Sequence, residues 1–166
     1  GSLEQYLYLR CSLTELDAKR VVRQLLEGLS YLHKSGIVHC DLKPANILFS
    51  DIDYGVNATT DSGKSVPRAQ HTGTEGFVAP EVLKSKPYGK AADTWSTGCM
   101  LYQMLTGRMP WMPSRACLHR PLSTTGPSWK NISDRAKSLV EDLLNTDQNL
   151  RADVEQAMHH PWFEDF

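Results

Sequence analysis

The 166-residue sequence has few cysteines, no excess of either charge and no long hydrophobic run, and each absence excludes a class of protein. Four cysteines without a CxxC pair are too sparse for a disulfide-rich secreted scaffold and lie at no zinc-finger spacing. Eighteen Lys and Arg balance nineteen Asp and Glu, so no global field draws the chain to nucleic acid or to an anionic membrane. The apolar runs are far too short for a membrane span. We therefore expect a soluble protein with reduced thiols, intracellular and cytoplasmic, with no nucleic-acid partner.

Helical periodicity dominates the rest of the sequence, whose 40% hydrophobic content is enough for one core. Apolar residues recur at helical spacing between Thr14 and Gly36, behind an acidic first turn, which predicts a capped amphipathic helix. Residues 91–106 are apolar on nearly every face, which predicts a helix at the centre of the fold. Two further helices are expected to begin at Ser133 and Asp153.

The segments between these helices contain little strand. The short apolar stretch at 47–49 indicates one strand. Residues 51–74 are mostly small and polar, without an apolar period, and predict a long functional loop. The prolines of residues 110–127 interrupt the helical pattern. The sequence thus predicts a mainly α domain with one or two short strands.

An acid, an amine and an amide lie within six residues of one another before the predicted strand. Asp41 can accept a proton from a hydroxyl, Lys43 can neutralise a phosphoryl oxygen, and Asn46 can offer its carbonyl oxygen to a hard divalent cation. Further along, Asp53 adds a carboxylate ahead of Gly55, a residue that permits a sharp turn. Together these side chains predict a phosphate site at which Asn46 and Asp53 share a magnesium ion.

Four motifs then follow one another in a specific order. They are HCDLKPAN at 39–46, DYG at 53–55, GTEGFVAPE at 73–81 and DTWSTG at 93–98. They resemble the catalytic loop, the metal-binding triplet, the substrate-facing loop and the start of the buried central helix of eukaryotic serine/threonine protein kinases. The end of the chain, at 132–163, is similar to the calcium/calmodulin-dependent kinases. The resemblance implies the mainly α-helical large lobe of the two-lobed kinase fold.

The resemblance implies a catalytic role for three residues. Asp41 would be the base that orients the substrate hydroxyl, and Lys43 would contact the transferred phosphate. Thr74 would hydrogen-bond near both of them. A lysine at position 43 with Gly73-Thr74 resembles kinases that act on Ser and Thr rather than on Tyr.

The cofactors implied are ATP and Mg²⁺. By the resemblance, Asn46 and Asp53 would hold the metal, Lys43 would contact ATP, and Leu48 would lie beneath the adenine. The structural residues that carry over are a Glu81–Arg151 ion pair and Asp93, which would anchor the backbone of the catalytic loop.

The same resemblance divides the kinase domain portion at 1–166 into segments. They are a post-hinge segment (1–11), the catalytic loop (39–46), the activation segment (53–81) and the central and terminal helices (91–166). Neither a glycine-rich GxGxxG motif nor a strand lysine precedes His39. We therefore expect the small N-terminal β lobe, which roofs the ATP site, to be absent from this chain and supplied by the parent protein.

Several positions depart from the family pattern. Only residues 47–52 separate Asn46 from Asp53, too few for the usual β-hairpin, which is expected to be stunted or absent. Prolines disfavour the helix expected at 112–129. Cys40, expected to be buried, replaces the arginine that pairs with a phosphorylated loop in many relatives, and Gln70 occupies the usual acceptor position. These two residues predict activity without loop phosphorylation.

Three functions fit these observations. The first is transfer of the ATP γ-phosphoryl group to Ser or Thr hydroxyls of a protein substrate, in a chain inactive without its small lobe. The second is a pseudokinase or truncated interaction module without catalysis. The third, a small-molecule phosphotransferase of related fold, is less favoured because residues 73–81 resemble a protein-substrate loop.

Overall fold

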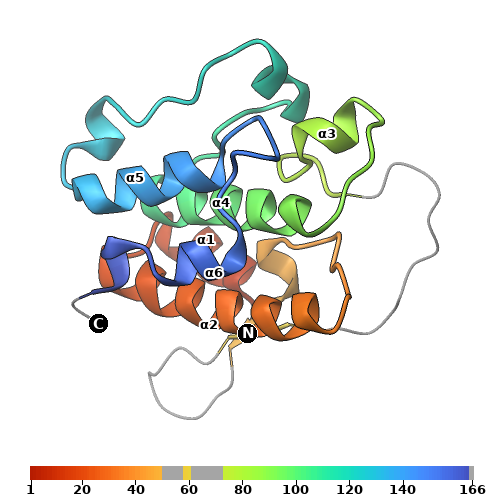
Figure 1. Cartoon of the computed structure of the whole chain (residues 1–166). Coiled ribbons are helices and arrows are strands. Elements are labelled where there is room, and N and C mark those ends of the chain that lie inside the picture. The colour runs from red at the N-terminus through yellow and green to blue at the C-terminus, as the bar shows by residue number, and fades with distance from the viewer. Residues whose placement is uncertain (50–57, 61–72, 165–166) are drawn as a thin grey trace.

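The computed structural model describes residues 1–49, 58–60 and 73–164 (Figure 1). The predictions for Asp53, for the DYG triplet that contains it, and for Gln70 lie outside these residues. No helix in the described ranges is both long and apolar enough to cross a bilayer.

Helix α4 (Lys90–Thr106) lies across the centre of the molecule, as its all-round apolar pattern predicts (Figure 1). It ends at Gly107, whose φ of 71° is the left-handed conformation that glycine adopts without strain. Helix α5 (Asp134–Leu143) packs on one side of α4. The two helices approach closely at Gly98, where a Cβ atom would lie 2.8 Å from the Cβ of Leu143. A glycine at this position is therefore required by the packing.

Helix α2 (Glu15–Lys34) packs against α4 and carries the amphipathic pattern seen in the sequence. The Thr14 side chain caps it by accepting a hydrogen bond from the Asp17 backbone N–H. Helix α6 (Val154–Met158) packs on α2 and begins with the predicted capping box of Asp153 and Gln156, and η4 (Pro161–Phe163) follows it. The largest fully buried side chains come from these helices and from segments packed against them: Trp95, Trp162, Leu3, Leu25, Leu26, Leu29, Leu42, Ile47, Met100, Leu101, Met104 and Leu139.

Two helices were not predicted from the sequence. Helix α1 (Leu3–Arg10) opens with a capping box in which the side chains of Ser2 and Gln5 each bond the other's backbone N–H. Helix α3 (Pro80–Leu83) is a single turn with proline at its first position. Both helices are too short for their apolar spacing to stand out from the surrounding sequence.

The expectation of a continuous loop over residues 51–74 is wrong, because a strand lies within it. Strand β1 (Ile47–Phe49) pairs antiparallel with β2 (Ala58–Thr60), and Ile47 lies opposite Thr60. Residues 47–52, which were expected to be too few for a β-hairpin, contain β1 but not its partner strand. The partner, β2, follows Asp53 in the sequence. The pairing satisfies backbone groups that β1 would otherwise expose. The Ala-Thr-Thr segment of β2, unlike the apolar residues of β1, contains too few apolar residues to indicate a strand.

The proline-rich stretch contains no α-helix within its described residues, as predicted. It forms two short 3₁₀ turns, η2 (Ser114–Leu118) and η3 (Pro127–Trp129). Turn η2 packs against α3, so this stretch lies beside the segment that contains residues 73–81.

Candidate active site

Residues 39–43 cross the molecule between α2 and η1 (Pro44–Asn46), and Asp93 in the first turn of α4 holds them in place. Its Oδ2 accepts a hydrogen bond from the backbone N–H of His39 at 2.9 Å, and its Oδ1 accepts one from that of Cys40, also at 2.9 Å. Cys40 has a φ of 67°, unusual for a residue with a side chain. The two hydrogen bonds that Asp93 accepts stabilise this conformation, which confirms the predicted anchoring contact.

A third group joins Asp93 from α2. The Nε2 atom of His33 lies 2.8 Å from Oδ2 of Asp93, and both residues are buried. The carboxylate thus connects three segments of the lobe. Sequence reasoning missed His33, because a histidine on the buried face of a helix has no local signal for this partner.

Asp41, Lys43 and Thr74 form a closed triangle. The Lys43 Nζ lies 2.9 Å from Oδ2 of Asp41 and donates a hydrogen bond to the Thr74 hydroxyl at 2.8 Å. That hydroxyl in turn donates to Oδ1 of Asp41 at 2.9 Å. The structure therefore brings together the three residues predicted as catalytic, although Thr74 is 33 positions from Asp41.

The triangle favours the ionised form of Asp41. Partial burial by itself raises the pKa of this carboxyl group. The hydrogen bonds from Lys43, Thr74 and Asn46, together with the charge of Lys43, outweigh burial and hold the pKa below its ordinary value. Asp41 is therefore a carboxylate at neutral pH, and its lone pairs are not all used by these partners.

Asn46 is oriented by the same carboxylate residue. Its Nδ2 donates to the backbone carbonyl of Asp41 at 2.9 Å and lies 3.4 Å from Oδ2. The Asn46 amide oxygen makes no hydrogen bond to the described part of the chain, and an amide oxygen is a ligand that Mg²⁺ accepts. The described residues contain no group of three or more His, Cys, Asp or Glu that could hold a metal by themselves.

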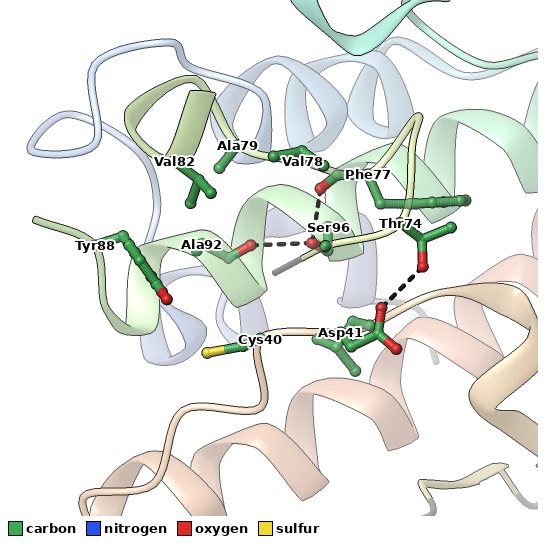
Figure 2. Close-up of a pocket in the computed structure, with 12 residues that line it drawn as sticks. Cys40, Asp41, Thr74, Phe77, Val78, Ala79, Val82, Tyr88, Ala92 and Ser96 are labelled. Carbon is green, nitrogen blue, oxygen red and sulfur yellow. Dashed lines mark hydrogen bonds between the residues drawn. The ribbon is translucent and has the colours of Figure 1, made fainter. Parts of the chain in front are cut away.

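A small pocket lies between this loop and residues 73–79 (Figure 2). Asp41 and Cys40 line it from below, with Phe77 and Tyr88 on other walls. The expectation that Cys40 is buried is wrong, because its side chain is only partly buried. The left-handed conformation of its backbone places this side chain at the pocket. Burial, and then the negative charge of Asp93, raise the pKa of the Cys40 thiol, which is opposite to what a nucleophilic cysteine requires.

The loop above the pocket is fixed by η2. The Gly76 N–H donates to the Ser114 hydroxyl at 2.6 Å, and the Ser114 N–H donates to the carboxylate of Glu75. On its other side, the Ser96 hydroxyl of α4 lies 3.0 Å from the Phe77 carbonyl oxygen (Figure 2). Sequence reasoning missed the Ser114 contacts, because nothing local marks this serine within the proline-rich stretch.

The end of this segment is held by a buried ion pair. The Arg151 guanidinium binds both carboxylate oxygens of Glu81, at 2.7 and 2.9 Å, and the two side chains are 0% and 3% exposed. Arg151 also donates to the Ala91 carbonyl oxygen and lies over the Trp95 ring at 4.9 Å. The predicted Glu81–Arg151 pair is confirmed, 70 positions apart in the sequence.

Leu48 and Asp53 are the two remaining predicted site residues. Leu48 lies on β1 with 43% of its surface exposed, whereas its neighbour Ile47 is fully buried. Leu48 therefore offers an open apolar surface beside the catalytic loop. Asp53 lies outside the described residues.

Comparison with known sequences decides the family of this site. The protein kinase domain matches residues 1–163. The chain belongs to the protein kinase domain family. The kinase domain is 39% identical over 177 aligned positions to the calcium/calmodulin-dependent protein kinase type 1 of Caenorhabditis briggsae, covering 98% of this chain and 49% of that protein.

Two further relatives match nearly the whole chain and a similar fraction of their own length. The serine/threonine-protein kinase H1 homolog of Danio rerio is 37% identical over 98% of the kinase domain and 42% of its own length. The liver/testis phosphorylase b kinase gamma catalytic chain of Mus musculus is 35% identical over 99% and 44%. The chain thus spans about half the length or less of these relatives, and the predicted likeness to calcium/calmodulin-dependent kinases is confirmed. The mainly helical fold is that of a kinase large lobe.

Proposed function

We propose that this kinase domain, within its full-length protein, transfers the γ-phosphoryl group of ATP to Ser or Thr hydroxyls of a protein substrate. The observation that carries the proposal is the triangle of Asp41, Lys43 and Thr74. It places a carboxylate, an ammonium and a hydroxyl around one point at the edge of the pocket. This is the combination that phosphoryl transfer requires, because catalysis there consists of positioning and charge stabilisation.

Asp41 supplies the acceptor for the substrate hydroxyl. Its ionised carboxylate takes a hydrogen bond from the incoming Ser or Thr, which aims the hydroxyl oxygen at the γ-phosphorus. As the new O–P bond forms, the bond between the phosphorus and ADP breaks, and the hydroxyl proton passes to the Asp41 carboxylate. The bonds from Thr74 and Lys43 fix the rotamer of Asp41 before substrate arrives.

Lys43 acts on the other reactant. Its ammonium group neutralises charge on the oxygens of the transferred phosphoryl group, while its bond to Thr74 keeps it beside Asp41. Asn46 and Asp53 would hold Mg²⁺, which supplies charge neutralisation of the phosphates when bound. The amide oxygen of Asn46, which makes no hydrogen bond to the described residues, supports this assignment.

The proposal assigns the rest of the ATP site to two contributors. Leu48 would pack against the adenine with its exposed side chain, and the small lobe of the full-length protein would cover the nucleotide. A soluble cytoplasmic location fits the four cysteines, all of which are free thiols in the structure.

The proposal is tested by Asp41→Asn in the full-length protein, assayed for transfer of ³²P from ATP to Ser- and Thr-containing peptides. We expect transfer to fall by about two to four orders of magnitude, because the amide cannot accept the proton. Asp142→Asn, on an exposed position of α5, is the matched control and should keep full activity. Wild-type protein that transfers no phosphate to any protein or peptide would instead favour the pseudokinase alternative.

A further inference from the structure

The kinase domain has a local excess of positive charge that its near-neutral total conceals. Between positions 82 and 133 the chain has seven Lys and Arg residues and one acid, Asp93, which is buried. Residues 134–164 show the opposite balance, with seven acids and three Lys and Arg residues. The cations are therefore concentrated in the part of the chain that follows the substrate-facing loop.

These cations are available to a partner. Lys84, Lys86, Arg108, Arg115 and Arg120 are all exposed. None of them forms an ion pair with a residue in the described ranges. Several exposed cations without partners on one surface create a positive potential that a ligand can use.

Part of this charge lies on a turn between two residues that line the pocket. Val82 and Tyr88 line the pocket, and Figure 2 shows both side chains on the far side from Asp41. Lys84 and Lys86 lie between these two lining residues in the sequence, on the exposed turn that follows α3. The two lysines are therefore on the turn that connects Val82 and Tyr88, two residues that line the pocket.

Two further cations, Arg108 and Arg115, lie next in sequence to residues that approach the substrate-facing loop. Arg115 directly follows Ser114, whose hydroxyl accepts the Gly76 N–H at 2.6 Å. Arg108 precedes Met109, and a Cβ on Gly76 would lie 2.9 Å from the Met109 Cε. Arg108 and Arg115 are thus each next in sequence to a residue that lies against the substrate-facing loop at Gly76.

The acids near the pocket offset this charge only in part. The Glu75 carboxylate accepts the Ser114 N–H, and Glu81 is buried against Arg151. Asp41 is paired with Lys43. Among residues 73–120, all of which the structure describes, Glu75 is the only exposed acid, whereas six Lys and Arg residues are exposed. The positive charge therefore remains in excess on this part of the chain.

We propose that the surface formed by Lys84, Lys86, Arg108 and Arg115 selects substrates with acidic residues close to the acceptor Ser or Thr. The inference rests on the proposed function, since it names the substrate class of the same site. The acceptor hydroxyl meets Asp41, and aspartate or glutamate side chains nearby meet the four cations. A substrate with Lys or Arg at those positions meets like charge, which opposes its binding.

The experiment compares three peptides with one acceptor Ser and otherwise identical sequences, flanked on both sides by Asp, by Asn or by Lys. With the full-length protein we expect a KM for the Asp peptide about five- to tenfold below that of the Asn peptide, and a higher KM for the Lys peptide, because a few exposed ion pairs each contribute modestly. The preference should shrink in about 0.5 M salt, which screens exposed charges. The kcat should differ little among the peptides.

Two charge-reversed variants locate the effect. Lys84→Glu combined with Arg115→Glu should reduce the preference for the Asp peptide to less than about twofold. Arg20→Glu combined with Lys34→Glu makes the same charge change on α2, none of whose residues lines the pocket, and should leave the preference intact. Equal KM values, the lowest KM for the Lys peptide, or a preference that survives the Lys84/Arg115 reversal would overturn the inference.

A binding measurement separates this inference from the proposed function. Fluorescently labelled peptides with Ala in place of the acceptor Ser report affinity by anisotropy without any transfer. Tighter binding of the Asp peptide together with no phosphorylation of any Ser peptide would overturn the proposed function while supporting the acidic-substrate surface. Phosphorylation of all three Ser peptides without an Asp preference in binding would support the proposed function and overturn the acidic-substrate surface.

Discussion

The kinase domain uses charged side chains in two different environments. Three charged side chains are buried in the described part of the chain: Glu81, Arg151 and Asp93. Each forms its hydrogen bonds with backbone groups or with another buried side chain. Asp41 and Lys43 are partly exposed, with side chains 44% and 26% accessible, and keep capacity for further partners. The buried groups fix the segments, whereas the half-exposed groups remain free to bind.

The difference follows from the cost of removing charge from water. A buried ion is tolerated only when every group around it is satisfied, so its geometry cannot adapt to a ligand. At the pocket edge water offsets the incomplete pairing, so a carboxylate can stay ionised with open lone pairs. Replacing residues of the two classes should therefore give different results, mainly in stability for one and mainly in activity for the other.

The largest effect on stability is expected for Arg151→Met. It leaves the Glu81 carboxylate buried without its partner, which should lower the free energy of unfolding by about 3–5 kcal/mol. Urea unfolding of the full-length protein followed by tryptophan fluorescence measures the loss. Adding Glu81→Gln should recover part of it, because the unpaired charge is removed. A change of less than about 1 kcal/mol for Arg151→Met would contradict the role given to this pair.

Asp93→Asn should lower both the stability and the phosphoryl-transfer activity. Asparagine has one acceptor oxygen where aspartate has two, so one of the His39 and Cys40 backbone N–H groups loses its partner, at a cost of about 1–3 kcal/mol. The catalytic loop should then shift, and transfer at saturating ATP and peptide should fall about tenfold or more. Full activity in a destabilised variant would show that Asp93 supports the fold without positioning Asp41.

Thr74→Val should separate activity from stability most clearly. Valine keeps the shape but removes the hydroxyl that joins Lys43 to Asp41. We expect kcat to fall about tenfold, with a stability change below about 1 kcal/mol, since the site is partly exposed. Thr74→Ser retains the hydroxyl and is the control. Equal kcat values for the Val and Ser variants would contradict the positioning role of the hydroxyl.

The smallest effect is expected for Glu15→Gln, which tests a third, intermediate environment at the start of α2. Partial burial raises the pKa of Glu15, but hydrogen bonds from Ser133 and Trp162 and the charge of Lys19 hold it below its ordinary value. A lowered folded-state pKa means that ionised Glu15 stabilises the fold above the unfolded value of 4.5 and that this contribution disappears as the pH falls through the lower folded value.

Wild-type protein and the Gln variant should therefore differ by about 1 kcal/mol at pH 7 and converge as the pH falls through the folded-state pKa of Glu15, which lies below 4.5. Thermal unfolding at a series of pH values measures the difference. A gap that stays constant from pH 7 to pH 3 would show that shape, and not charge, explains the contribution of Glu15.

The sequence predicted those parts of the site whose chemistry is local. Asp41, Lys43 and Asn46 lie within one short segment, so their types and spacing indicated a phosphate and metal site before any contact was known. Helices α2, α4 and α5 were predicted because their apolar periodicity runs over several turns.

Contacts between distant segments were found only where the family resemblance supplied them, as for Asp93 with residues 39–40. No local signal marked the bond between Ser114 and Gly76 or the pairing of β1 with β2. These features depend on which surfaces meet after folding. They therefore have no fixed spacing in the chain.

The sequence by itself determined the helical class, the residues of the catalytic loop and the near-neutral total charge, since each depends on residue identity and short-range order. Only the tertiary structure decided that the Thr74 hydroxyl closes a triangle with Asp41 and Lys43, and that Ser114, next to Arg115, binds the loop at Gly76. The physical reason is that burial and charge pairing are properties of the space around a residue. That space is made by segments far apart in the chain.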